Sequence, residues 1–120
     1  MEIKLELDNG VVILQLSGNL VASTAETLRE QIARLIEKNF RFIVLDLGKV
    51  DFIDSSGLGS CISSNRDLAV HNGVLACSGL NDNVRKVFRM TRADQKIQIF
   101  AARRDALYAL LELTGAACKK

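Results

Sequence analysis

A short, almost continuous apolar run near the middle of the chain limits the folds open to this sequence. Residues 42–47 read Phe-Ile-Val-Leu-Asp-Leu, with a single charged side chain. A strand that faces solvent on one side alternates apolar and polar residues, whereas a strand covered on both faces stays apolar throughout. Because such strands belong to mostly parallel sheets with helices on both sides, the run predicts an α/β domain.

The segments on either side of this run fit the same class. Residues 2–7 place Ile3, Leu5 and Leu7 on one side, and the following Asn9-Gly10 pair indicates a hairpin turn. The predicted elements are strands at 2–7 and 11–16, a helix from the capping box Ser23-Thr24-Ala25-Glu26 to about 38, a strand at 42–47, a helix at about 56–70, a strand at 74–77, a helix capped by Asn81-Asp82, a strand at 97–100 and a helix at 105–113. This order predicts a hairpin followed by right-handed βαβ crossovers.

Length and composition indicate an ordinary globular domain. The chain has 120 residues, of which 48% are hydrophobic and 25% charged. We expect one domain at residues 1–114 and a flexible C-terminal tail at 115–120. No apolar run approaches the ~20 residues of a membrane span, and the N-terminus lacks the layout of a secretory signal. The expected location is cytoplasmic, without a membrane span.

The cysteines and charges point to no cofactor. Cys61, Cys77 and Cys118 are widely spaced with no Cys-x-x-Cys pair, so we interpret them as reduced structural thiols and expect neither a disulfide nor a metal site. Residues 1–60 hold 6 basic and 9 acidic side chains, and residues 61–120 hold 10 basic and 5 acidic. With only 5% aromatic residues, we interpret the basic excess as solvated helix faces and expect no nucleic acid partner.

The segment from Asp51 to Gly59 carries the chemistry of interest. It reads Asp-Phe-Ile-Asp-Ser-Ser-Gly-Leu-Gly and lies where the apolar strand gives way to a helix. Asp54 and Ser55 are both competent N-cap residues, and the free N–H groups of a helix N-terminus tolerate a phosphate. Gly57 and Gly59 are poor helix formers, so close approach of a ligand or partner and tight packing against the sheet are both open explanations for them.

The segment Val50-Asp51-Phe52-Ile53-Asp54-Ser55-Ser56-Gly57-Leu58-Gly59 resembles the signature of STAS domains, specifically the bacterial anti-sigma-factor antagonists. Gly18, the Thr24–Leu28 segment and Val84–Phe88 extend the resemblance over nearly the whole chain. It implies a mixed, mostly parallel sheet of about five strands with an N-terminal hairpin, flanked by about four helices.

The resemblance also implies a function without catalysis. The unphosphorylated antagonist binds an anti-sigma factor that is also a serine kinase, which releases the sigma factor, and phosphorylation of a serine ends that binding. Ser56 aligns with the phosphorylated position. Ser55 is the fallback acceptor and the preferred helix cap. A serine phosphatase would restore the free form.

A docking face follows from the predicted second helix. Ser56, Ser60, Ser63, Ser64 and Asp67 fall on one polar side at helical spacing, opposite a core stripe. The complete set of predicted partner-binding residues is Asn19, Asp51, Asp54, Ser55, Gly57, Leu58, Ser60, Ser63 and Ser64. A competing interpretation of Ser60, Ser63 and Ser64 is that they are simply exposed to water. Asp51 and Asp54 could instead have a capping or turn role.

One residue departs from the family pattern. Members usually carry an acidic residue after the Gly-x-Leu that ends the second strand, where this chain has Gly18-Asn19-Leu20-Val21. The Val21 side chain brings neither charge nor a hydrogen-bond acceptor to the serine segment. An alternative function is therefore a STAS interaction module in a non-sigma assembly, such as a lipid-transport accessory or a stressosome-like scaffold.

An enzyme is the remaining rival. Asp46, Asp51 and Asp54 near the end of one strand could hold Mg²⁺, but no P-loop accompanies them. An α-helix rises roughly 1.5 Å per residue, so the sole histidine, His71, lies a whole helix length away from the serines. We therefore expect no catalytic activity.

Overall fold

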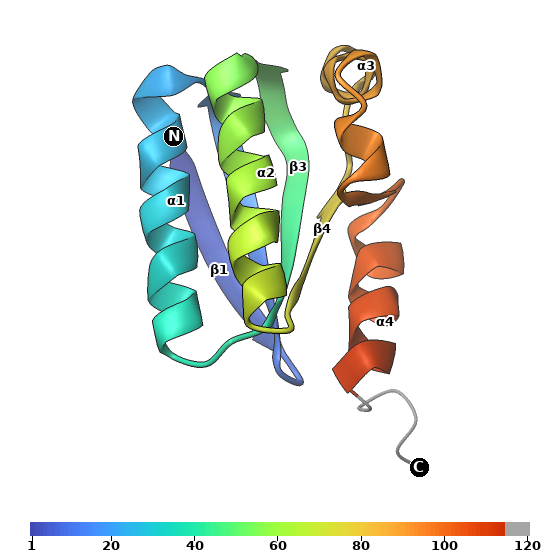
Figure 1. Ribbon diagram of the computed structural model, residues 1–120. Coiled ribbons are helices and arrows are strands. Elements are labelled where there is room, and N and C mark those ends of the chain that lie inside the picture. Colours follow the sequence, from blue (N-terminus) through green and yellow to red (C-terminus); the bar gives the residue numbers. More distant parts are fainter. Residues whose placement is uncertain (115–120) are drawn as a thin grey trace.

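The computed structural model describes residues 1–114. In this part of the chain the strands form one five-stranded sheet with helices on both faces (Figure 1). The elements are β1 (Glu2–Asp8), β2 (Val11–Leu20), α1 (Ala22–Glu37), β3 (Phe42–Ile53), α2 (Ser55–Val70), β4 (Val74–Ser78), α3 (Asp82–Met90), the short 3-10 helix η1 (Ala93–Gln95), β5 (Gln98–Phe100) and α4 (Arg103–Thr114). The α/β class and the element order are confirmed. The predicted tail at 115–120 lies outside the described residues.

The sheet has the order β1-β2-β3-β4-β5. β1 and β2 are antiparallel, and all other neighbouring strands pair in parallel. Asn9 and Gly10 between β1 and β2 have φ values of 50° and 91°. Positive φ at both central residues is what a type I′ hairpin turn requires, so the predicted hairpin is confirmed.

Two apolar clusters cover the two faces of the sheet. The larger cluster lies under α1, α2 and α3 and includes Leu14, Leu45 and Phe88, whereas the smaller joins Val44 to Leu110 of α4. Figure 1 shows α1 and α2 side by side on one face. Successive residues of β3, Val44 and Leu45, thus belong to different clusters, as a strand buried on both faces requires.

Strands β2 and β3 both run further than the sequence predicted. β3 reaches Ile53, because Val50 and Ile53 remain buried and pair with Gly18 and Leu20 of β2. The register shifts twice along this extension, once before and once after Gly18. As a result only Asp54 separates the end of β3 from the first residue of α2.

The start of α1 corrects the predicted capping box. The helix begins at Ala22, so its N-cap is Val21 and not Ser23. Valine has no side-chain acceptor. Instead the Thr24 hydroxyl accepts the Val21 N–H at 2.9 Å and donates to the Asn19 carbonyl at 2.8 Å. The connection from β2 into α1 is therefore fixed by a threonine inside the helix.

Candidate functional site

Asp54, which lies between β3 and α2, contacts three backbone segments. Its Oδ1 accepts the Gly57 N–H at 2.8 Å, which caps α2. Its own N–H donates to the Leu20 carbonyl at 3.2 Å, and Oδ2 lies 3.4 Å from the Ala22 nitrogen at the start of α1. One carboxylate thus meets the N-termini of two helices, where their partial positive charge stabilises it.

The two serines occupy the first turn of α2, but neither is the cap. Our assignment of Ser55 as the preferred cap was wrong, because Asp54 takes that position and Ser55 is already helical. Ser55 is exposed and Ser56 half-buried. Within residues 1–114, neither hydroxyl forms a hydrogen bond with a protein group, so both are available to a modifying group or a partner.

The two glycines of the segment differ in their surroundings. A Cβ on Gly57 would overlap the Leu20 carbonyl oxygen, whereas no atom of the described residues lies within 4 Å of the equivalent position on Gly59. Tight packing against the end of β2 therefore explains Gly57. The space beside Gly59 is open, and no packing contact accounts for that glycine.

Four of the predicted partner-binding residues are buried. Ser60 and Ser64 are 0% and 1% exposed, so the predicted exposed serine stripe is wrong at both positions. They follow Gly57 at helical spacing on the side of α2 where small side chains allow close packing, and the Ser60 hydroxyl donates to the Gly57 carbonyl. Gly57 and Leu58 are buried as well, and Leu58 belongs to the core, so none of the four offers surface to a partner.

The remaining predicted contact residues do reach the surface. Asn19, Asp51 and Ser55 are exposed, and Asp54 and Ser63 are half-buried. Phe52, which the sequence analysis did not select, is 52% exposed at the end of β3. Strict alternation would place Phe52 on the same face as the buried Val50, so the sequence carried no signal for its exposure, and the register between β2 and β3 shifts just here, between Gly18 and Leu20.

Helix α3 is attached to the same end of β3. Asn81 caps the helix by accepting the Val84 N–H at 2.8 Å, as predicted. Its amide nitrogen also donates to the carbonyls of Val50 and Asp51, at 3.1 and 3.2 Å. The backbone beside the serine segment is thus held from the α3 side too.

Val21 precedes α1 close to the start of α2. The next residue, Ala22, places its N–H 3.4 Å from Asp54 Oδ2. Val21 itself is half-buried and caps α1 through its backbone alone.

The aspartates of the enzyme hypothesis do not form a metal site. Asp46 pairs with Arg103 of α4 at 2.9 Å, and the same guanidinium reaches Glu6 of β1 at 3.1 Å. Burial lowers the pKa of Arg103, but the hydrogen bonds and charges of Asp46 and Glu6 raise it more. Asp54 is engaged by backbone N–H groups, and among residues 1–114 no three potential ligands gather to hold a metal ion.

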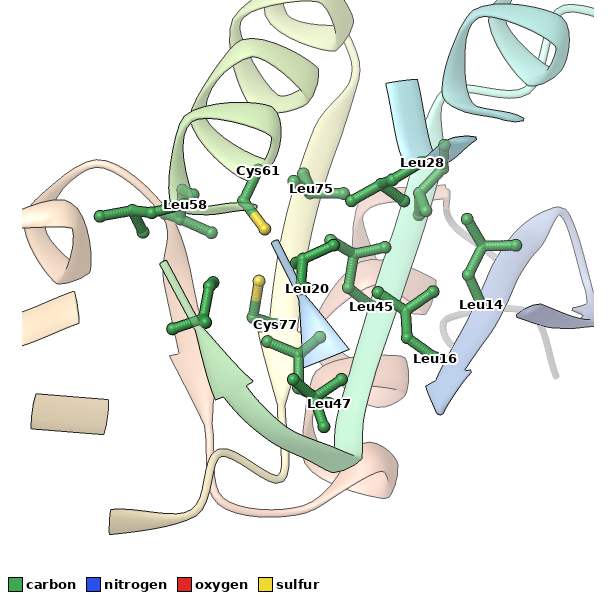
Figure 2. Packing of buried hydrophobic residues seen from close by; sticks show 14 of the residues in the cluster. Leu14, Leu16, Leu20, Leu28, Leu45, Leu47, Leu58, Cys61, Leu75 and Cys77 are labelled. Atoms are coloured by element: carbon green, nitrogen blue, oxygen red, sulfur yellow. The ribbon is translucent and has the colours of Figure 1, made fainter. Parts of the chain in front are cut away.

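Two cysteines lie directly beneath α2. Figure 2 shows Cys61 of α2 and Cys77 of β4 with their sulfur atoms turned toward each other, and both are free thiols in the core. The hydrogen bond with Cys61 and burial raise the pKa of Cys77. Their burial fits a structural role for these two cysteines, and Cys118 lies outside the described residues.

The sequence is similar to those of known proteins. A sequence model described as "STAS domain" matches residues 2–106. A putative anti-sigma factor antagonist, BtrV of Bordetella bronchiseptica, is 32% identical over 91 residues, covering 76% of this chain and 78% of its own. An anti-sigma F factor antagonist of Paenibacillus polymyxa is 30% identical over 111 residues, covering 92% and 95%.

Solved structures share the fold. The crystal structure of a putative anti-sigma factor antagonist from Thermotoga maritima superimposes with a TM-score of 0.85 at 23% identity, over 89% of this chain and 92% of that one. In the described part of the chain, no helix combines the length and apolar character needed to cross a bilayer.

Proposed function

Because the chain belongs to the STAS domain family, we propose that it is an anti-sigma-factor antagonist whose binding to an anti-sigma factor is ended by phosphorylation of Ser56. The protein acts by binding and carries out no catalysis. The observation that carries the proposal is the first turn of α2, where the Ser56 hydroxyl has no partner among residues 1–114 and the helix end is fixed by Asp54.

The electrostatics of that turn favour a phosphate on Ser56. The first turn of α2 contains no acidic residue, so its free N–H groups meet no side-chain charge beyond the cap. A phosphoryl group adds about −1.5 to −2 charges, which the helix N-terminus stabilises. The fold therefore tolerates the modification, and its effect falls on the partner.

The size of that effect is sufficient for a switch. Two added charges ~6 Å from one partner carboxylate are repelled by roughly 1.4 kcal/mol at the dielectric constant of water and roughly 5.5 kcal/mol at an effective value of 20. This corresponds to about tenfold to ten-thousandfold weaker binding before salt screening.

The surface proposed to meet the partner surrounds Ser56. It consists of the exposed residues Asn19, Asp51, Phe52 and Ser55, with Ser63 further along α2. Phe52 supplies the apolar area that usually anchors an interface, and the polar residues form its rim. In this arrangement Asp54 positions the surface from within and contributes little direct contact.

The test uses the serine kinase anti-sigma factor encoded in the same genome. Incubation with this kinase and ATP, followed by mass spectrometry, should place phosphate on Ser56, and Ser56→Ala should abolish the modification while Ser55→Ala leaves it. Calorimetric titration should give Ser56→Ala the affinity of the native chain and weaken Ser56→Asp at least tenfold. Equal binding by both variants would remove Ser56 from the mechanism.

A serine phosphatase is the proposed counterpart that restores the binding form. Treatment of the phosphorylated chain with a metal-dependent serine phosphatase should return its affinity for the anti-sigma factor to that of the unmodified chain. Failure of every candidate anti-sigma factor to bind either form would instead favour a STAS module in a non-sigma assembly.

A further inference from the structure

A hollow on the α3 side of the molecule has no part in the Ser56 surface. Its lining residues are Arg85 and Arg89 of α3, Asp94 of η1 and Ile99 of β5. Its volume of about 440 Å³ lies within the usual range of small-molecule sites. None of the four residues belongs to the serine segment or to α2, so the hollow is a separate feature.

Two of the lining residues are arginines. Arg85 and Arg89 are one helical turn apart on α3 and both are exposed. Within residues 1–114 neither takes part in an ion pair or a side-chain hydrogen bond. Like charges at this spacing destabilise a helix unless an anion lies between them. Among residues 1–114, Asp94 is the only acidic residue in the lining.

The walls of the hollow are held in place by buried and hydrogen-bonded neighbours. Val84 and Phe88 next to the two arginines are fully buried, which fixes the face that α3 presents. Arg92 adopts a left-handed φ of 63°, and this turn brings Asp94 back beside α3. The Asn65 side chain of α2 donates to the Lys96 carbonyl at 3.0 Å and anchors the end of η1. The backbone around the hollow is therefore fixed, and ordering of the exposed arginine side chains is the remaining cost of binding.

We propose that this hollow binds a small phosphate ester of a hydroxylated compound, of the sugar phosphate class. The guanidinium groups of Arg85 and Arg89 match the geometry of phosphate oxygens, which accept two N–H bonds from each fork. Asp94 accepts hydrogen bonds from ligand hydroxyls and, because it repels a second anion, orients the phosphate toward α3. Ile99 contacts the C–H face of the ligand.

The test is calorimetric titration of the full chain with glucose 6-phosphate, inorganic phosphate and glucose in separate experiments. Glucose 6-phosphate should bind saturably at millimolar concentration or below, inorganic phosphate more weakly, and glucose without detectable heat. Raising the salt concentration from about 50 to about 200 mM should weaken the binding of both anions.

Matched variants locate the site. Arg85→Gln and Arg89→Gln should each weaken glucose 6-phosphate binding at least tenfold, since each removes a charge-assisted hydrogen bond. Asp94→Asn should weaken glucose 6-phosphate binding but not inorganic phosphate binding. Arg104→Gln makes the same charge change at an exposed position of α4 and should bind like the native chain. Circular dichroism confirms that each variant is folded.

Three results would overturn the proposal. One is the absence of saturable binding at about 10 mM glucose 6-phosphate. The second is an equal loss of affinity in Arg104→Gln, which would mean that only net charge matters. The third is binding of a phosphoserine peptide while no small ester binds, which would assign the hollow to a protein partner. None of these depends on Ser56, so the proposed function is tested independently.

Discussion

Helices α2 and α3 begin at the same end of β3, and different residues cap the free backbone N–H groups of their N-termini. In each case a side-chain oxygen accepts the N–H of the third helical residue at 2.8 Å, from Asp54 in α2 and from Asn81 in α3. The difference lies in the second contact. Asp54 also faces the Ala22 N–H, whereas Asn81 donates to the carbonyls of Val50 and Asp51.

The second contact decides which cap residue fits. A carboxylate can only accept, so it suits a position between the N–H groups of two helices. An amide both accepts and donates, so it suits a position between an N–H group and two carbonyls. General helix propensity ranks Asp and Asn as nearly equal caps, and only the surroundings distinguish them.

The first turns differ in the same way. α3 contains Asp82 in its first turn, but α2 contains no acidic residue there and carries Ser55 and Ser56 instead. Its third helical residue is Gly57 against the end of β2, where α3 has Val84 in the core. The α2 N-terminus is thus tightly packed on the inside and without charge on the outside.

Substitution of Gly57 should have the largest effect. Gly57→Ala places a methyl group against the Leu20 carbonyl, which is rigid backbone, so we expect a loss of about 3 kcal/mol in the free energy of unfolding. Urea denaturation measures this. Gly59→Ala is the matched control, because its Cβ meets nothing within 4 Å, and it should be neutral or stabilising by up to about 1 kcal/mol. Similar values for the two variants would contradict the packing account of Gly57.

Changing the α3 cap should come next. Asn81→Asp keeps the acceptor for the Val84 N–H but loses both donated bonds and turns a carboxylate toward two carbonyls. We expect a loss of about 2 kcal/mol in the free energy of unfolding, partly offset by the helix dipole. Urea denaturation again provides the measurement. An unchanged stability would mean that the amide donors contribute nothing.

The opposite exchange in α2 should be milder. Asp54→Asn keeps an acceptor for Gly57 but loses the charge and the weaker contact with Ala22, so we expect a loss of about 1 kcal/mol. Hydrogen exchange of the Gly57 and Ala22 amides should become faster in this variant. If Asp54→Asn proved more harmful than Asn81→Asp, the comparison of the two caps would be reversed.

Adding an acid to each first turn gives the smallest expected effect. Ser56→Asp should raise the free energy of unfolding by about 0.3–1 kcal/mol, because it supplies the charge that the first turn of α2 lacks. Asn83→Asp is at the same helical position of α3, beside Asp82, and should gain less. Thermal unfolding at low salt can resolve this difference. A loss of stability in Ser56→Asp would contradict the tolerance for phosphate proposed above.

The sequence predicted the elements better than their ends. The apolar run 42–47 led directly to a strand buried on both faces, and the Asn9-Gly10 turn and the Asn81 cap were also found, because each depends on local chemistry. The extension of β3 to Ile53 could not be read from the alternating segment alone, since it depends on pairing with β2.

The errors at the site have a common physical origin. Ser60 and Ser64 looked like an exposed stripe because serine is usually at the surface, but on α2 their small size lets the helix pack closely. Ser55 and Asp54 were equivalent as caps in the sequence, and only the approach of α1 made the acceptor-only side chain fit. Tertiary contacts decided both cases, and a single sequence does not contain them.

The position of Asp54 has a consequence for how fast the proposed partner docks. Since β2, β3, α1 and α2 converge on one residue, the surface around Ser56 has no loop to rearrange before a partner docks. Association then resembles the collision of two preformed shapes, with a rate governed by diffusion and orientation. The phosphorylation proposed for Ser56 would change the charge of one of those shapes and leave its outline in place.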